Sequence, residues 1–120
     1  MSYDSTQDDR LWAMLSYVLG IVTWFIGPLI LFLVKKDSSK FVGFHAMQGL
    51  IMYGALSVLW VGTSVLSGIL GLLAAPLWFL APVASLAVFI FAIIGAIKSY
   101  AGEWYEVPLV GKMARQQVGV

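Results

Sequence analysis

Two long runs of uncharged, mostly apolar residues, separated by one short polar segment, dominate the pattern along this chain. Residues 11–34 carry no charged side chain, and residues 41–97 carry none either. A helix over the first run would be about 36 Å long, enough to cross a hydrocarbon layer about 30 Å thick. One helix over the second run would reach about 85 Å, so this run must fold as two helices. The pattern predicts an all-α integral membrane bundle of three transmembrane helices.

The second run turns back where small residues and prolines gather, at residues 67–76. Pro76 or Pro82 can open the third helix, because proline is tolerated in a first helical turn. All 120 residues then form a single membrane domain. Its expected parts are a polar N-terminal tail at residues 1–10, spans at about 11–34, 41–68 and 76–100, and an interfacial C-terminal tail at 101–120.

Gly27 and Pro28 interrupt the first apolar run. Proline removes a backbone donor and disfavours helical geometry at the residue before it. The first span is therefore predicted to be kinked or broken at Gly27 and Pro28. Broken helices can mark binding sites in transporters, but proline is also common in ordinary membrane helices.

Short polar side chains predict where two helices begin. Ser5 or Thr6 is followed three residues later by an aspartate, which fits either a helix start of capping-box type or a frayed tail with solubilising acids. A hydroxyl or carboxylate at residues 37–39 can cap the second helix in the same way.

The C-terminal tail carries two further signals. Gly102 can end the third helix, since glycine readily adopts the left-handed conformation that follows a helix. Residues 108–117 are expected either to form a short surface helix that directs Lys112 and Arg115 toward anionic lipid, or to be a loosely held tail.

Basic residues near the ends of the spans predict the orientation. Arg10 falls on one side of the three-span arrangement and six basic residues fall on the other. We therefore expect the N-terminus outside the cell and the C-terminus in the cytoplasm. The six are Lys35, Lys36, Lys40, Lys98, Lys112 and Arg115.

Composition narrows the possible functions. Hydrophobic residues make up 61% of the chain and charged residues 11%, whereas soluble domains carry about 25% charged residues. The mean hydropathy of +0.93 agrees with lipid as the surrounding solvent. The chain has no cysteine, so disulfides and thiolate chemistry are excluded. A net charge of +1 without a basic stripe gives no sign of nucleic-acid binding.

Small residues spaced four apart predict where helices pack, because membrane helices associate through close backbone approach. Such pairs occur in both helices of the second run. They are Ser64/Gly68, Ser67/Gly71, Ala81/Ser85, Ala92/Ala96 and Gly95/Ser99.

His45 and Gln48 are the candidate polar site within the membrane. They share a helix face and lie about 8 and 12 Å beyond Lys40 along the second helix. Polar groups at that depth need partners. The pair is either a site for a proton, a small ligand or a partner helix, or a hydrogen-bonded pair that fixes this helix against its neighbours, which we favour.

The residues predict no enzyme, metal site or cofactor. One histidine without cysteine or a carboxylate at the same depth cannot supply three or four metal ligands. No nucleophile, base and orienting group come together, and no phosphate-binding loop is present. Glu103 and Glu106, beside Trp104 and Tyr105, are expected to mark a solvated interface rather than an acid–base pair.

Two stretches resemble a known family. Residues 39–50 read Ser-Lys-Phe-Val-Gly-Phe-His-Ala-Met-Gln-Gly-Leu, and residues 98–108 end in a Gly-Glu-x-Tyr-x-x-Pro pattern. Both are similar to small prokaryotic membrane proteins related to the twenty-kilodalton membrane subunit of the chloroplast inner-envelope import translocon. The matched positions are candidate contacts for a partner or ligand: Phe41, Phe44, His45, Gln48, Gly102, Glu103, Tyr105 and Pro108.

The chain departs from this family at two positions. Gly43 stands where the family usually has arginine, and Gly49 where it usually has serine. A role of that arginine in binding head groups or a partner therefore does not carry over. The resemblance implies a multi-pass helical bundle in the plasma membrane of a prokaryote.

Three functions remain open from the sequence. The first is a non-enzymatic scaffold or assembly subunit that binds other membrane proteins or further copies of itself in the bilayer. The second is an oligomeric channel or carrier for ions or small solutes, with Gly27, Pro28, His45 and Gln48 near its pathway. The third, with least support, is an enzyme acting on lipid through Glu103.

Overall fold

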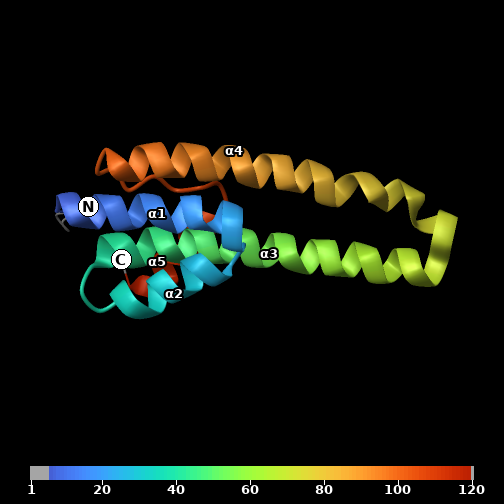
Figure 1. Cartoon of the computed structure of the whole chain (residues 1–120), viewed down its shortest axis with the longest axis horizontal. Coiled ribbons are helices and arrows are strands. Elements are labelled where there is room, and N and C mark those ends of the chain that lie inside the picture. Colours follow the sequence, from blue (N-terminus) through green and yellow to red (C-terminus); the bar gives the residue numbers. More distant parts are fainter. Residues whose placement is uncertain (1–5, 120) are drawn as a thin grey trace.

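The computed structural model describes residues 6–119, and these are all helix or short connections, as the apolar pattern predicts (Figure 1). The molecule is elongated, with extents of 52 × 24 × 22 Å. The helical elements are α1 (Gln7–Thr23), α2 (Ile26–Lys35), α3 (Lys40–Leu70), the 3-10 helix η1 (Gly71–Phe79), α4 (Leu80–Tyr100) and α5 (Val110–Val118).

The predicted capping box starts α1. The backbone N–H of Asp9 donates to Thr6 Oγ1 at 3.1 Å, and the Thr6 N–H donates to Asp9 Oδ2 at 3.2 Å. These two bonds satisfy backbone donors that a helix start leaves unpaired. The alternative cap, Ser5, lies outside the described residues.

The predicted first span is two helices instead of one. α1 ends where the Trp24 N–H donates to Gly20 O at 2.8 Å, and Trp24 has a positive φ of 60°. The chain then reverses, and α2 returns toward the end of the molecule where α1 begins (Figure 1). The predicted break at Gly27 and Pro28 is therefore misplaced. Pro28 stands in the first turn of α2, where a helix needs no N–H donor.

This reversal places the start of α1 at the same end of the molecule as the end of α2. The Arg10 side chain lies against Gly102, since a Cβ there would be 2.8 Å from Arg10 Nε. Lys35 Nζ lies 4.9 Å from the centre of the Trp12 ring, so the start of α1 and the end of α2 are neighbours. The prediction that Arg10 lies at the opposite end from the other basic residues is wrong.

The second apolar run forms the predicted pair of antiparallel helices. Ser39 Oγ accepts from the Val42 N–H at 3.2 Å and caps α3, which is about 46 Å long. α4 starts at Leu80 rather than at Pro76, because residues 71–79 form the 3-10 helix η1. Pro82 then falls in the first turn of α4, where it does not interrupt helical hydrogen bonding.

The C-terminal tail is ordered by the predicted glycine. Gly102 has a φ of 86°, its N–H donates to Ser99 O, and the Glu103 N–H donates to Lys98 O. This pattern is a Schellman motif, which ends α4 and turns the chain back. Residues 103–107 lead through a turn at residues 108–109 into α5, so of the two alternatives for this tail the short helix is present.

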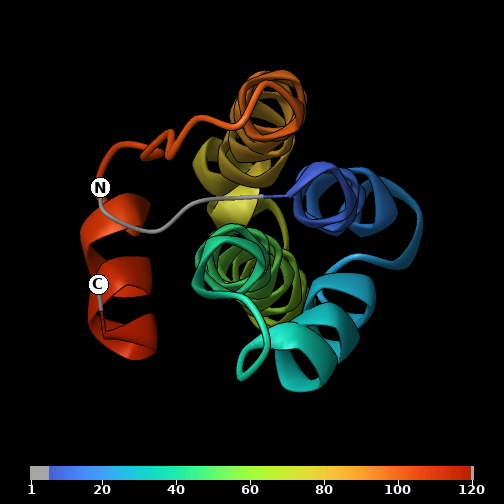
Figure 2. The ribbon, with the colours of Figure 1, turned by 90° about the vertical axis from the view of Figure 1, so that its left-hand side faces the viewer.

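The molecule has two halves of different construction. We call α1, α2, residues 103–109 and α5 the collar, because they pack around the first part of α3 and beside the last part of α4. Figure 2 shows α1 and α2 on one side of α3 and α5 on the other. Residues 57–88, which we call the far half, contain only the rest of α3, η1 and the start of α4.

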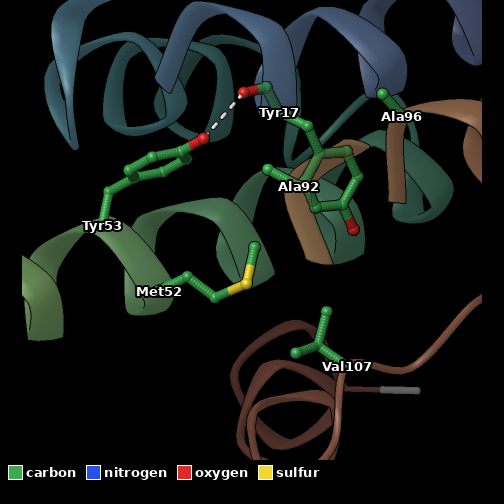
Figure 3. Close-up of a cluster of buried hydrophobic side chains, with 6 residues drawn as sticks. All are labelled: Tyr17, Met52, Tyr53, Ala92, Ala96 and Val107. Atoms are coloured by element: carbon green, nitrogen blue, oxygen red, sulfur yellow. Dashed lines mark hydrogen bonds between the residues drawn. The ribbon is translucent and has the colours of Figure 1, made fainter. Parts of the chain in front are cut away.

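The core lies inside the collar. One buried cluster joins α1, α3, α4 and the tail, and is formed by Tyr17, Met52, Tyr53, Ala92, Ala96 and Val107 (Figure 3). Gly95 allows the Tyr17 ring to approach, since a Cβ there would lie 2.8 Å from Tyr17 Cζ. The small residues of α4 from Ala92 to Ser99 are therefore a packing face, as predicted. A Cβ at Gly68, in the far half, would meet no atom within 4 Å, so this glycine packs against nothing.

Candidate functional site

The two sequence motifs meet inside the collar. His45 and Gln48, one turn apart on α3, both contact the backbone of residues 103–107. Tyr17, from the middle of α1, completes the group. We call Tyr17, His45, Gln48 and the backbone that they bind the polar network.

His45 bridges α1 and the tail. Its Nε2 lies 2.9 Å from Glu103 O, and its Nδ1 lies 2.6 Å from the Tyr17 hydroxyl. A carbonyl oxygen only accepts, so we assign the ring proton to Nε2. Nδ1 then accepts from the Tyr17 hydroxyl. This tautomer is neutral, and both of its nitrogen atoms are used.

Gln48 makes three hydrogen bonds in the same network. Its Nε2 donates to the Tyr17 hydroxyl at 2.7 Å and to Tyr105 O at 2.8 Å. Its Oε1 accepts from the Val107 N–H at 2.7 Å. A glutamine side chain carries two N–H donors and one carbonyl, and each of these groups has a partner here. The side-chain amide therefore bonds to a backbone C=O and a backbone N–H of the tail, as a neighbouring strand would in a β-sheet.

The polar network is complete within one chain. His45, Gln48 and Tyr17 are each 0% exposed, and no buried side-chain N or O atom of residues 6–119 lacks a hydrogen-bond partner. An unpaired polar group would be costly in apolar surroundings, so this completeness stabilises the attachment of the tail. The arrangement corresponds to the structural interpretation of His45 and Gln48 rather than to an open ligand site.

Aromatic rings pack around His45 at one end of the network. Phe41 and Phe44 flank the His45 ring edge-on, with centroids 4.7 and 5.1 Å away. The Trp104 ring lies 5.2 Å from Phe41 and 5.4 Å from Phe44. The Arg115 guanidinium stands 5.1 Å from the Phe44 centroid. Phe41 and Phe44 are therefore buried around His45 and contribute to packing within the chain.

Charged side chains at the partly exposed rim of the collar link the tail and α5 to their neighbours. Lys98 Nζ lies 3.7 Å from a Glu103 carboxylate oxygen, and both side chains are about half exposed. Glu106 forms an ion pair with Arg115, which ties the extended segment to α5. Lys40 Nζ donates to Val118 O at 2.8 Å and holds the end of α5 against α3.

The other predicted site residues have separate positions. Gly102 forms the turn after α4, and the Tyr105 carbonyl is bound by Gln48. Pro108 lines a groove of about 290 Å³ between α3 and α4, together with Leu56 and Val88. The structure thus brings Glu103 and Tyr105 to the network through their backbone, and leaves Pro108 at its edge.

Sequence reasoning missed Tyr17 and Val107. Tyr17 has a weak signal, since it is the one hydroxyl-bearing aromatic in the apolar part of the first run. Val107 has no signal, because it contributes a backbone N–H and an apolar side chain. Tyr53, whose hydroxyl donates to Tyr17 O at 3.2 Å, was also overlooked (Figure 3).

The two family departures differ in their surroundings. A Cβ at Gly49 would lie 3.2 Å from Ser16 O and 3.4 Å from the Pro28 ring, so this glycine lets α1 and α2 approach α3 closely. A Cβ at Gly43 would lie 3.4 Å from Lys36 Cα, which is an ordinary contact. A side chain at residue 43 would therefore point toward the α2–α3 turn beside Lys36.

Comparisons with known proteins place the chain among membrane proteins. It is 38% identical over 104 residues to a UPF0132 membrane protein of Archaeoglobus fulgidus, covering 85% of this chain and 94% of the relative. It is 37% identical over 110 residues to UPF0132 membrane protein MJ1443 of Methanocaldococcus jannaschii, covering 91% and 87%. No solved structure matches.

These relatives support the predicted group of small prokaryotic membrane proteins, while its link to the chloroplast translocon subunit stays a prediction. Helical length and composition agree with a membrane location. The stretch Lys40–Tyr100 is long and apolar enough to cross a bilayer, and Ile26–Lys35 is a shorter apolar helix. The model of the magnetosome magnetite crystal formation protein family matches residues 8–114, and the chain belongs to this family.

Proposed function

We propose that this membrane protein is a non-enzymatic assembly subunit that binds other membrane proteins through its far half. Both halves expose apolar side chains, and the supporting observation is that no collar segment covers the far half. Inside the collar, the buried polar groups are occupied by bonds within the chain. In the far half, large apolar side chains are exposed on α3, η1 and α4. They include Val58, Val61, Val65, Ile69, Leu72, Leu73, Phe79, Val83 and Leu86.

Polar side chains of the far half are also mostly used locally. Ser57, Thr63 and Ser67 each donate to the carbonyl four residues earlier in α3. Such bonds leave little hydrogen-bonding capacity for a transported solute. A surface of this kind is suited to van der Waals packing against another helix, which is how membrane helices associate.

We further propose that the chain crosses the membrane twice, through α3 and α4. In this topology α1 and α2 enter and leave on the same side (Figure 1), which we expect to be the cytoplasm. All seven basic residues belong to the collar, to the turn after α2, or to the ends of α3 and α4 on that side. The location is the plasma membrane of a prokaryotic cell. The family description concerns magnetite crystal formation in magnetosomes, and an organising subunit in a membrane would suit such a process.

Single cysteines test the topology, because the natural chain has none. Asp8→Cys, Ser38→Cys and Leu73→Cys are each labelled in intact cells with an impermeant maleimide. Two crossings predict that Asp8→Cys and Ser38→Cys behave alike and that Leu73→Cys behaves oppositely. If Asp8→Cys instead followed Leu73→Cys, α1 would cross the membrane and the proposed topology would be wrong.

Photocrosslinking in native membranes tests the subunit function. A photoactivatable maleimide on Val65→Cys or Leu86→Cys should give discrete protein adducts, because these side chains are exposed on the far half. Leu33→Cys on α2 is the matched collar position, also exposed and apolar. Lipid adducts alone at Val65 and Leu86 would contradict the proposal.

The channel or carrier function receives less support. It requires His45 and Gln48 beside a pathway, whereas both are fully buried and hydrogen-bonded to the tail. Liposome flux distinguishes the two functions. A flux that His45→Ala abolishes, in a variant that keeps its fold, would favour the channel.

A further inference from the structure

The collar stops at one level along α3 on both sides of the molecule. On one side, the α1–α2 turn meets α3 at Ser57, Trp60 and Val61, around a groove of about 560 Å³. On the other side, the turn between the tail and α5 meets Leu56 and Leu59. Ser57 lies about 26 Å from Lys40, a little more than halfway along α3. Of residues 6–119, only α3, η1 and α4 continue beyond this level (Figure 1).

α1 and α2 form one segment that enters the collar and returns. The tail, here residues 103–109, forms a second such segment together with α5. Its contacts descend along α3, with Glu103 O at His45, Tyr105 O at Gln48, and Pro108 beside Leu56. The chain then turns at Leu109, and α5 returns until Val118 reaches Lys40. The collar thus consists of two hairpins, one on each side of α3 (Figure 2).

Both hairpins turn at a non-glycine residue with positive φ. Trp24 has φ 60° and Leu109 has φ 68°, a region that L-residues rarely adopt. Their side chains are exposed, by 40% for Trp24 and 88% for Leu109. Large apolar side chains at both tips suit a position within lipid, so both hairpins add volume to one half of the bilayer only.

We propose that the free chain is a wedge that prefers curved membrane, convex on the side of the collar. This inference rests on the proposed two-crossing topology. The collar widens the protein in one leaflet, while two helices occupy the other. Curvature that is convex on the collar side gives the collar's leaflet more area per chain. It thereby accommodates the difference in width between the two ends of the protein, as for other segments that fill one leaflet. The ligand is therefore a lipid surface of a particular curvature.

Membrane tubes pulled from giant vesicles test this preference. The vesicles contain phosphatidylcholine, phosphatidylglycerol and the full chain alone, inserted in both orientations. An impermeant fluorescent maleimide on Ser38→Cys marks chains with the collar outside, and on Leu73→Cys it marks chains with the collar inside. Each population is compared between the tube and the flat membrane.

The two orientations should sort in opposite directions. We expect collar-outside chains to be enriched on the tube by about twofold, equivalent to about 0.4 kcal/mol because tenfold corresponds to about 1.4 kcal/mol. Collar-inside chains should be depleted. Equal sorting of the two populations would overturn the proposal. This result is also expected if copies pair through the far half, because the pair would then no longer be narrower on that side.

A pair of substitutions changes the wedge without touching the core. A Cβ at Gly62 or Gly68 meets no atom within 4 Å, so Gly62→Trp with Gly68→Trp widens the far half and should reduce the sorting. Ile30→Trp, at an exposed collar position, is the matched control and should not reduce it. Unchanged sorting in the Gly62/Gly68 variant would also count against the wedge. Cysteine labelling that contradicts two crossings would instead refute the topology, so the two failures are distinguishable.

Discussion

The two halves of α3 have the same kind of sequence but different surroundings. Residues 41–49 are all buried, under α1, α2, the tail and α5. Beyond Ser57 most positions of the same helix are exposed, and Gly62 and Gly68 pack against nothing. Hydrophobicity therefore does not decide which half is packed. Close approach at glycines and a completed polar network decide it, as expected where lipid is as apolar as the protein.

The largest expected effect comes from filling a tight glycine in the collar. A Cβ at Gly20 would lie 2.0 Å from Tyr53 Cε2, and Tyr53 is buried and bound to Tyr17 O. We expect Gly20→Ala to lower the free energy of unfolding by about 3 kcal/mol, since overpacking a filled core is costly. Unfolding in mixed micelles measures this.

The matched control is Gly62→Ala in the far half, where a Cβ meets no neighbour. This change should leave stability equal or raise it by up to about 1 kcal/mol, because alanine favours helix more than glycine. Equal losses at Gly20 and Gly62 would remove the contrast between the halves.

The second effect concerns the attachment of the tail. Gln48→Leu keeps the apolar bulk but leaves Tyr105 O and the Val107 N–H without their partner. We expect a loss of about 2 kcal/mol, because buried groups left unpaired are costly. Hydrogen exchange at the Val107 amide should become faster. Ser57→Ala removes a bond within one helix and is the control. Unchanged protection of Val107 would show that Gln48 does not hold the tail.

A smaller effect is expected from Tyr17→Phe. The variant keeps the ring against Gly95 but removes the hydroxyl that joins His45 and Gln48. A loss of about 1 kcal/mol follows, typical of one hydrogen-bonding group. Unfolding of the double variant with Gln48→Leu measures the coupling. Strictly additive losses would contradict a shared network.

The smallest effect is expected at the rim. Lys98 and Glu103 form a half-exposed ion pair at 3.7 Å. Lys98→Ala should change stability by about 0–1 kcal/mol, and less at high salt, because solvent screens such pairs. Thermal unfolding at two salt concentrations measures this. A large, salt-independent loss would mean that the rim also stabilises the collar.

Several features of the fold could be predicted from short-range signals. The Thr6 and Asp9 capping box, the Ser39 cap and the Gly102 turn depend on residues a few positions apart, and all three are present. The pairing of α3 with α4 follows from a charge-free run that is too long for one crossing. The break in the first run was placed wrongly, because proline suggested a kink where it only opens α2.

The candidate site was only half predictable. The shared helix face and depth of His45 and Gln48 follow from their spacing. Apart from the Tyr17 hydroxyl, their partners are backbone groups, 57 and 59 residues away in the chain for Gln48 and 58 for His45. Backbone groups carry no sequence signal. Tyr17 could be suspected only as a hydroxyl in an apolar run.

The sequence by itself determined a helical chain suited to lipid, with its basic residues near the helix ends and most of its caps. Only the tertiary structure decided that the first run folds back at Trp24 and that the tail is bound along α3 by Gln48. The physical reason is that an uncharged run specifies burial in apolar surroundings but not a path through them. That path depends on where Gly20, Gly49 and Gly95 allow close approach and where the polar network is completed.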